Sequence, residues 1–175
     1  LAWFHEHEQA MEAWEQSIAT AINGTLYGIS AVYDQMIKQG HGHVVNISSI
    51  LGNTATEGCG VYNVTKAAVR MLGDSLRIES RGKIKVTNIK PPSVAATGLV
   101  ATEVDYNAGL AGVYSKIINA FTQLGTSGLD DPESMKCFDF GPSIMADNII
   151  YAINQPWGVD ISELTIRATN ETMFV

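Results

Sequence analysis

Residues 44–66 read VVNISSILGNTATEGCGVYNVTK, and this stretch decides how the rest of the chain is interpreted. Its apolar start is short and ends in Ser48 and Ser49, a pattern typical of a buried strand with hydroxyls at its carboxyl end. A glycine-rich loop follows, and then an apolar-periodic segment that predicts a helix carrying Tyr62 and Lys66. Because these two residues are four positions apart, a helix places them on one face, one turn from each other.

Helices and strands are predicted to alternate on both sides of this stretch. Apolar residues recur every three or four positions between 11 and 37, which predicts a long amphipathic helix, interrupted or bent near Asn23-Gly24 and stopped by Gly40. The helix of the opening stretch is expected to end at 80–82, and residues 84–89 form the next predicted strand. Helical crossovers of this kind join parallel strands. The sequence therefore predicts an α/β fold with a layered parallel sheet.

The pattern is weaker between residues 93 and 141. A weak helix is predicted at 108–121, whereas residues 122–141 are rich in Gly, Ser and Asp. Such a segment beside the carboxyl end of a sheet suits a substrate lid, although a plain surface loop has the same composition. Pro142 is well placed for a first helical turn and predicts a further helix. Alternating apolar residues at 164–168 predict a last strand.

Composition argues against several classes of function. The chain has 175 residues, of which 46% are hydrophobic, enough for the core of one domain or most of one. A formal net charge of −7 and a pI near 4.9 argue against nucleic acid or an anionic membrane as a partner. No apolar run has membrane-spanning length, and the first residues lack a basic-then-apolar signal pattern. Cys59 and Cys137 are too few for a disulfide framework, so a cytoplasmic location is expected.

Ser49, Tyr62 and Lys66 together resemble the active-site segment of the short-chain dehydrogenase/reductase family. In that family a serine thirteen residues before the tyrosine of a Tyr-x-x-x-Lys pair completes the catalytic group, and Ser49 and Tyr62 have that spacing. Trp14 with the helix after it, and the segments NISS, YNVTK, IKVTNIKPPSV and ELTIRATN, are similar to family counterparts as well. The resemblance thus covers nearly the whole chain.

The resemblance implies a Rossmann-like doubly wound parallel sheet and an NAD- or NADP-dependent oxidoreductase that interconverts an alcohol and a ketone or aldehyde. Tyr62 would act as general acid and base, and Ser49 would hold the substrate oxygen. Lys66 would bind the nicotinamide ribose, and Pro91 and Val94 would line the nicotinamide pocket. A free phenol has a pKa of ~10, and lowering it by about three units requires roughly 4 kcal/mol of phenolate stabilisation, which the lysine ammonium would help to supply. The substrate, and the choice between NAD and NADP, stay open.

The resemblance also indicates parts that this chain lacks. The family's glycine-rich strand-to-helix turn, which places pyrophosphate on a helix N-terminus, does not precede Val44, and the chain begins at Leu1 instead of methionine. We therefore expect residues 1–175 to be one Rossmann-like domain without its amino-terminal half, the carboxyl-terminal part of a longer enzyme. Residues 97–141 are its predicted lid. Such a chain alone is expected to bind a nicotinamide cofactor weakly or not at all.

Family counterparts of the two long helices form a four-helix dimer interface. The resemblance therefore implies a homodimer or homotetramer of the intact protein. Apolar or small residues away from the catalytic face, namely Ala31, Ala68 and Met71, would then be buried between subunits.

Three positions depart from the family pattern. Ala21 stands where the family has an asparagine, seven residues after Trp14. Pro91-Pro92 replaces the Pro-Gly that usually follows the strand predicted at 84–89, and Ala96 replaces a threonine. These departures concern the proton relay and the carboxamide contacts of the cofactor. They motivate two alternatives, a catalytically silent fragment or binding module with the family fold, and a family member that catalyses elimination or isomerisation.

Other chemistries receive less support from the sequence. The pairs His5-x-His7 and His41-x-His43 have no nearby cysteine or third ligand, so we expect surface histidines and no metal site. No Gly-x-Ser-x-Gly motif is present, which disfavours a hydrolase nucleophile elbow.

Overall fold

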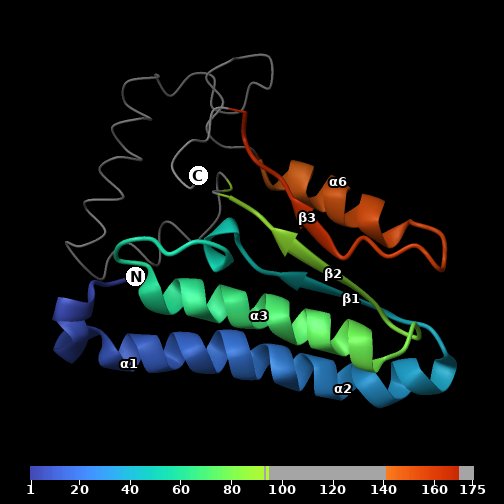
Figure 1. The fold of residues 1–175 in the computed structure, drawn as a ribbon, viewed down its shortest axis with the longest axis horizontal. Helices are drawn as coiled ribbons and strands as arrows, with labels where there is room; N and C mark the ends of the chain where they lie inside the picture. Colours follow the sequence, from blue (N-terminus) through green and yellow to red (C-terminus); the bar gives the residue numbers. More distant parts are fainter. Residues whose placement is uncertain (93, 95–140, 170–175) are drawn as a thin grey trace.

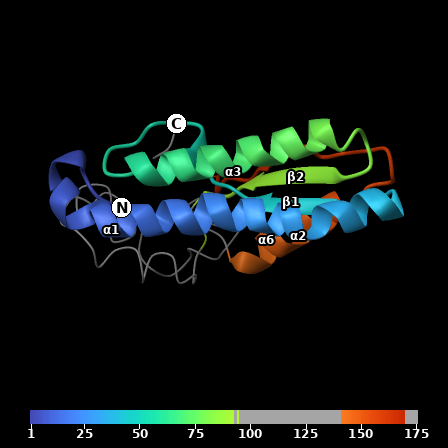
Figure 2. The ribbon, with the colours of Figure 1, turned by 90° about the horizontal axis from the view of Figure 1, so that it is seen from below.

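The computed structural model describes residues 1–92, 94 and 141–169 of the chain. Helices pack against both faces of a parallel sheet, with α3 on one face and α6 on the other (Figures 1 and 2). In chain order the elements are η1 (Phe4–Glu6), α1 (His7–Ile18), a π-helical turn η2 (Ala19–Asn23), α2 (Gly24–Gln39), β1 (His43–Ile47), η3 (Ile50–Gly52), α3 (Gly60–Glu79), β2 (Lys85–Lys90), α6 (Pro142–Ile153) and β3 (Glu163–Thr165).

The described part of the sheet has three strands in the order β1-β2-β3, and both pairings are parallel. Val44 pairs with Val86 and Ile47 with Ile89, so the carboxyl ends of β1 and β2 meet at one edge. The helix α3 connects these two strands, as expected for a crossover between parallel neighbours. The predicted α/β class with a parallel sheet is confirmed.

The predicted interruption of the first long helix is confirmed, and it takes the form of a π-helical turn. Gly24 N donates to Ala19 O, five residues back, and Thr25 Oγ1 donates to Ala21 O at 2.7 Å. The chain keeps its direction through this turn, so α1 and α2 run on nearly end to end (Figure 1). Gly40 ends α2 with a φ of 77°, a left-handed conformation that glycine adopts without steric cost.

The predicted limits of β1, β2 and α3 differ from the observed ones by one or two residues, whereas the last strand ends three residues earlier than predicted. Ser48 lies outside β1, although its N–H still donates to Ile89 O at 2.8 Å. The strand β2 extends to Lys90, and β3 is shorter than the predicted strand at 164–168. The predicted helix at 108–121 and the predicted lid at 97–141 lie outside the described residues, except Gly141.

Apolar clusters lie on both faces of the sheet. On the face of α6, Ile89, Met145 and Ala168 are buried together. On the other face, where α2 and α3 lie, the buried cluster consists of Leu76, Ile84 and Val86. Within residues 1–92, 94 and 141–169, no helix is both long and apolar enough to cross a membrane.

One predicted surface histidine is wrong. His43 is half-buried at the start of β1, and its Nε2 lies 2.8 Å from Thr87 Oγ1 on β2. Burial lowers the pKa of His43, and the charge of Lys85 lowers it further, while Asp160 acts in the opposite direction. The ring therefore joins β1 to β2 through a side-chain hydrogen bond and is only partly exposed to solvent.

Candidate active site

Ser49 lies just beyond the carboxyl end of β1 and is the N-cap residue of η3. Its Oγ accepts a hydrogen bond from Leu51 N at 3.1 Å, which caps this short helical turn. Ile50 N donates to Pro91 O at 3.1 Å, so the segment still lies beside the end of β2. The Ser49 side chain is buried, and because a hydroxyl accepts and donates, its own proton remains for a second partner.

Ser48 joins the end of β1 to α3. Its Oγ donates to Lys66 O at 2.7 Å. Gly52 follows on η3, where an added Cβ would lie 3.0 Å from Ala67 N and from the Lys66 carbonyl carbon. The turn and the helix therefore approach each other backbone to backbone, and this fixes the height of Lys66 above the sheet edge.

Tyr62 and Lys66 lie in the first two turns of α3, which begins at Gly60. Lys66 Nζ donates to Ile47 O at 3.2 Å and lies 5.6 Å from the centre of the Tyr62 ring. The structure thus brings the phenol and the amine together at the carboxyl end of β1. Ser49, two residues beyond Ile47, lies at the same sheet edge.

The two residues predicted to line the nicotinamide pocket, Pro91 and Val94, lie in different parts of the structure. Pro91 directly follows β2, and its carbonyl binds the turn that Ser49 caps. Val94 packs against the apolar cluster on the α6 face, beside Ile89 and Met145. Pro91 is therefore at the sheet edge that holds the other predicted residues, whereas Val94 lies on the α6 side of the sheet.

Ala21, which replaces the expected asparagine, belongs to the π-helical turn. This turn contacts α3, and the Ala21 side chain is half-buried. The hydroxyl of Thr25 donates its proton to the Ala21 carbonyl. The methyl group of Ala21 offers no hydrogen bond of its own.

A cavity of about 710 Å³ lies near this region but is lined by other residues. Asn63 Nδ2 donates to Thr54 O at 3.0 Å and ties the loop that forms one wall to α3. The lining includes none of Ser49, Tyr62 and Lys66. The lining residues come from the amino-terminal segment, the loop after η3 and the start of α3, namely 2–4, 51–58, Gly60, Asn63, Val64 and Ala67.

Potential metal ligands are dispersed in the part of the chain that the structure describes, where no three of His, Cys, Asp and Glu gather. His5 stacks on Trp3 with 6.1 Å between ring centres, and His41 meets the Trp157 ring edge-on. Cys59 is buried, and burial raises the pKa of its thiol, so the reactive thiolate is disfavoured.

The sheet-facing side of α3 carries a polar network that the sequence analysis missed. Arg70 and Asp74 continue the four-residue series of Tyr62 and Lys66 along the helix, and both contact the buried amide of Asn88 on β2. A series of polar residues at four-residue spacing was the available signal. Its partners on the strands were not visible in the local pattern.

Sequence comparison identifies related proteins. A family model described as short chain dehydrogenase matches residues 3–107. An uncharacterized oxidoreductase of Staphylococcus saprophyticus is 34% identical over 161 residues, which cover 91% of this chain and 56% of that relative. A second uncharacterized oxidoreductase, from Staphylococcus haemolyticus, is 32% identical over 158 residues, or 90% of this chain and 55% of the relative. The chain therefore spans little more than half the length of these relatives.

Solved structures share the fold. Serine dehydrogenase in its closed form, complexed with NADP+, superposes with a TM-score of 0.73 and 26% identity, covering 95% of this chain and 60% of that one. Serine dehydrogenase from Escherichia coli has a TM-score of 0.67 and 24% identity, with 95% and 58% covered. These structures confirm the predicted Rossmann-like α/β fold.

Proposed function

Since this chain belongs to the short chain dehydrogenase family, we propose that the protein is an NAD(P)-dependent oxidoreductase that interconverts an alcohol and a ketone or aldehyde. One observation carries the proposal. Lys66 Nζ lies over the Tyr62 ring and donates to Ile47 O, at the sheet edge where Ser49 caps η3. A phenol can transfer a proton to or from a substrate oxygen, and an amine and a hydroxyl at the same edge can assist it by charge and by hydrogen bonding.

Tyr62 is the proposed general acid and base. Its phenol would give a proton to a carbonyl oxygen in reduction and take one from an alcohol in oxidation. The Lys66 ammonium beside the ring would stabilise the phenolate, because an opposite charge within a few ångströms favours the ionised form. The bond from Lys66 to Ile47 O holds the amine in this place.

Ser49 is the proposed donor that orients the substrate oxygen. The bond from Leu51 N to Ser49 Oγ restricts the rotation of the side chain without using its proton. A buried donor held in one direction stabilises negative charge on a reacting oxygen better than one that must first reorient.

The residues at this edge fit the nicotinamide end of an NAD(P) cofactor. Ligands of parallel α/β sheets bind outside the carboxyl ends of the strands, where Lys66 presents its amine and Pro91 follows β2. The NADP+ complex of the 26% identical serine dehydrogenase supports a nicotinamide cofactor. We propose that Tyr62, Lys66 and Pro91 form this part of the cofactor site, whereas Val94 packs on the α6 side of the sheet. When bound, the cofactor supplies or accepts the hydride.

Turnover of the full-length protein tests the proposal. Purified protein is mixed with NADPH or NADH and carbonyl compounds, or with NADP+ or NAD+ and alcohols, serine first because a serine dehydrogenase shares the fold. Absorbance at the nicotinamide band is then followed. The proposal expects cofactor-dependent turnover with at least one substrate. Nicotinamide binding without turnover across the panel would favour the silent binding module, and substrate conversion without net cofactor oxidation or reduction would favour elimination or isomerisation.

We also propose that the intact protein is a cytoplasmic homodimer or homotetramer. Val64, Met71 and Ile78 follow one another at seven-residue spacing on α3, and their exposed fractions are 61%, 54% and 74%. A row of large apolar side chains left in water is typical of a protein interface. Ala31 is exposed and Ala68 half-buried, so both have surface left to bury in a dimer. Light scattering at micromolar concentration should give a dimer or tetramer mass, and a monomer would contradict the proposal.

A further inference from the structure

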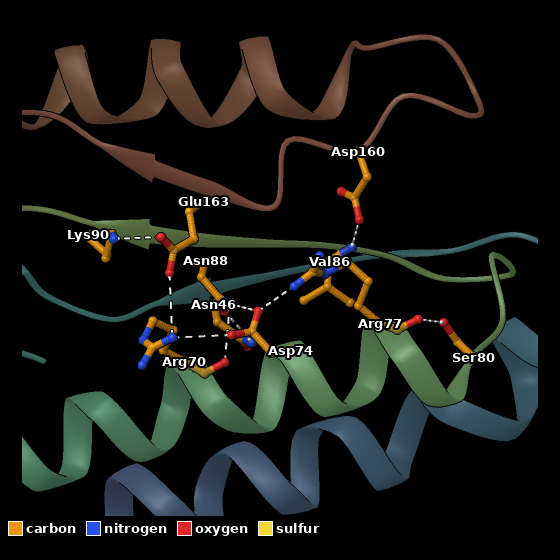
Figure 3. A network of polar contacts seen from close by, with 10 residues as sticks. All are labelled: Asn46, Arg70, Asp74, Arg77, Ser80, Val86, Asn88, Lys90, Asp160 and Glu163. Carbon is orange, nitrogen blue, oxygen red and sulfur yellow. Dashed lines mark hydrogen bonds and ion pairs between the residues drawn. The ribbon is translucent and has the colours of Figure 1, made fainter. Parts of the chain in front are cut away.

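Charged side chains lie on the side of α3 that faces the sheet, beside the buried residues Val69, Gly73 and Leu76. Tyr62, Lys66, Arg70 and Asp74 follow at four-residue spacing, so they form one stripe along the helix. An Arg70 guanidinium nitrogen lies 3.3 Å from one Asp74 oxygen, and an Arg77 nitrogen lies 2.6 Å from the other. Asp74 is 20% exposed at its side chain. The carboxylate therefore joins two cations at the interface between helix and sheet (Figure 3).

Two buried asparagine amides on the sheet lie opposite these charged residues, and one of them binds the helix. Asn88 on β2 is fully buried, and its Nδ2 donates to Arg70 O and to Asp74 Oδ1, each at 3.2 Å. Its Oδ1 accepts from Asn46 Nδ2 on β1 at 3.2 Å. Asn46 and Asn88 are register partners, so the pair bridges two strands directly under the helix (Figure 3).

The helix backbone lies close to the amide pair because Gly73 has no side chain. A Cβ on Gly73 would lie 2.4 Å from Asn88 Oδ1 and 2.5 Å from Asn46 Nδ2. The network also reaches the third strand. Glu163 on β3 binds Lys90 Nζ at 2.7 Å and lies 3.8 Å from an Arg70 nitrogen. All three described strands are thus connected to one segment of α3.

Stability alone does not account for this arrangement. Nε of Arg70 and Nε of Arg77 are buried and have no hydrogen-bond partner among the described residues. Replacing buried ion pairs with apolar residues is often neutral or stabilising. Hydrogen bonds differ from apolar contacts in that they fix direction. A slip of α3 by one residue would shift it about 1.5 Å and rotate it by about 100°, and Asn88 would lose both acceptors.

We propose that Arg70, Asp74 and Asn88 are positioning residues, which hold α3 in the register where the Lys66 amine reaches both Ile47 O and the Tyr62 ring. Asp74 lies two turns after Lys66 on the same continuous helix, so the sheet contact at one position sets the height of the other. The catalytic meaning of this positioning rests on the proposed function. The positioning itself is a property of the fold and can be measured without turnover.

The test measures where the Lys66 side chain lies. Full-length protein is labelled with ¹³C-lysine, and the NMR signal of the Lys66 ε-methylene is identified by its loss in Lys66→Arg. A methylene near the Tyr62 ring is displaced by the ring current, and Tyr62→Leu defines zero displacement. We expect Asp74→Ala to lose more than half of the displacement. Asp74→Asn, which keeps an oxygen for Asn88, should lose less.

Leu76→Val is the matched control. Leu76 lies on the same helix but in the apolar cluster with Ile84 and Val86, so this variant weakens α3 packing without touching the network. It should keep the displacement. In the enzyme assay, Asp74→Ala should lower kcat by about tenfold or more, as a misplaced catalytic group does, while Leu76→Val keeps it.

Full displacement in both folded Asp74 variants would overturn the proposal, and so would an equal loss in Leu76→Val. If Asp74→Ala does not fold, Asp74→Asn, which removes the ion pairs with Arg70 and Arg77, decides by the same measurement: a partial loss supports the proposal and full displacement overturns it. A wild-type protein that shows the displacement and no turnover with any tested substrate would contradict the proposed function, while the Asp74 comparison would still decide the positioning.

Discussion

Gly73→Ala should destabilise the protein, although alanine is the better helix former. The substitution would gain up to about 1 kcal/mol from helix propensity. The new Cβ, however, would lie 2.4 Å from Asn88 Oδ1 and 2.5 Å from Asn46 Nδ2, closer than real carbon contacts allow. Asn88 is fully buried and bound on both sides, so neither amide can swing away into solvent.

Two costs oppose the gain in propensity. Overpacking a filled interface costs about 1–3 kcal/mol, and a buried amide pushed off its partners costs about 1–3 kcal/mol more. We therefore expect a net loss of roughly 3 kcal/mol in the free energy of unfolding, a large share of the about 5–15 kcal/mol that a domain has.

The assay is urea unfolding followed by far-ultraviolet circular dichroism, with Gly28→Ala as the matched control. Gly28 lies within α2, and no atom lies within 4 Å of an added Cβ there. That variant should be unchanged or stabilised by up to about 1 kcal/mol. A Gly73→Ala protein as stable as the wild type would refute the close approach of α3 to the amide pair.

Three further predictions concern single residues. Lys66→Ala should weaken cofactor binding, measured by calorimetry, and should move the pH optimum of alcohol oxidation upward; an unchanged optimum would contradict the role of the amine. Ala21→Asn in the full-length enzyme should raise the turnover number and reduce its solvent isotope effect, and if neither changes, proton resupply at this position does not limit turnover. Because burial holds the pKa of His43 below its ordinary value of 6.5, only the unfolded state takes up this proton as the pH falls below 6.5. Stability should therefore decrease from that pH downward, and His43→Gln should flatten this part of the unfolding profile; an identical slope would exclude the contribution.

Apolar periodicity was sufficient to predict the architecture. Apolar residues recur at helical spacing in α2 and α3 and form short runs in β1 and β2. These patterns reflect which face of each element is buried, and they can be read locally in the sequence. The π-helical form of the turn at Ala19–Asn23 was harder to predict from the sequence. It is defined by which carbonyl each backbone N–H reaches, and the side-chain pattern does not show this. The ends of β2 were misjudged for a related reason. Lys90, which the prediction left outside the strand, is buried because Glu163, far along the chain, binds its amine.

The part of the candidate site that depends on the spacing of residues along the chain could be predicted from the sequence. Tyr62 and Lys66 share a helix turn, and Ser49 follows a recognisable strand, so their common sheet edge could be inferred. The pairing of Asn46 with Asn88 could not, because both amides lie on strands that read as ordinary buried segments. Only the register of the sheet brings them under α3.

Tyr62→Phe in the full-length protein tests whether the Tyr62 phenol is the general acid and base. The substitution removes the transferable proton and keeps the ring over which Lys66 lies. Turnover of the best substrate should fall by about 10²- to 10⁴-fold, the usual contribution of general acid–base catalysis, while the circular dichroism spectrum and the unfolding midpoint stay unchanged. A folded Tyr62→Phe protein that keeps wild-type turnover would contradict the account.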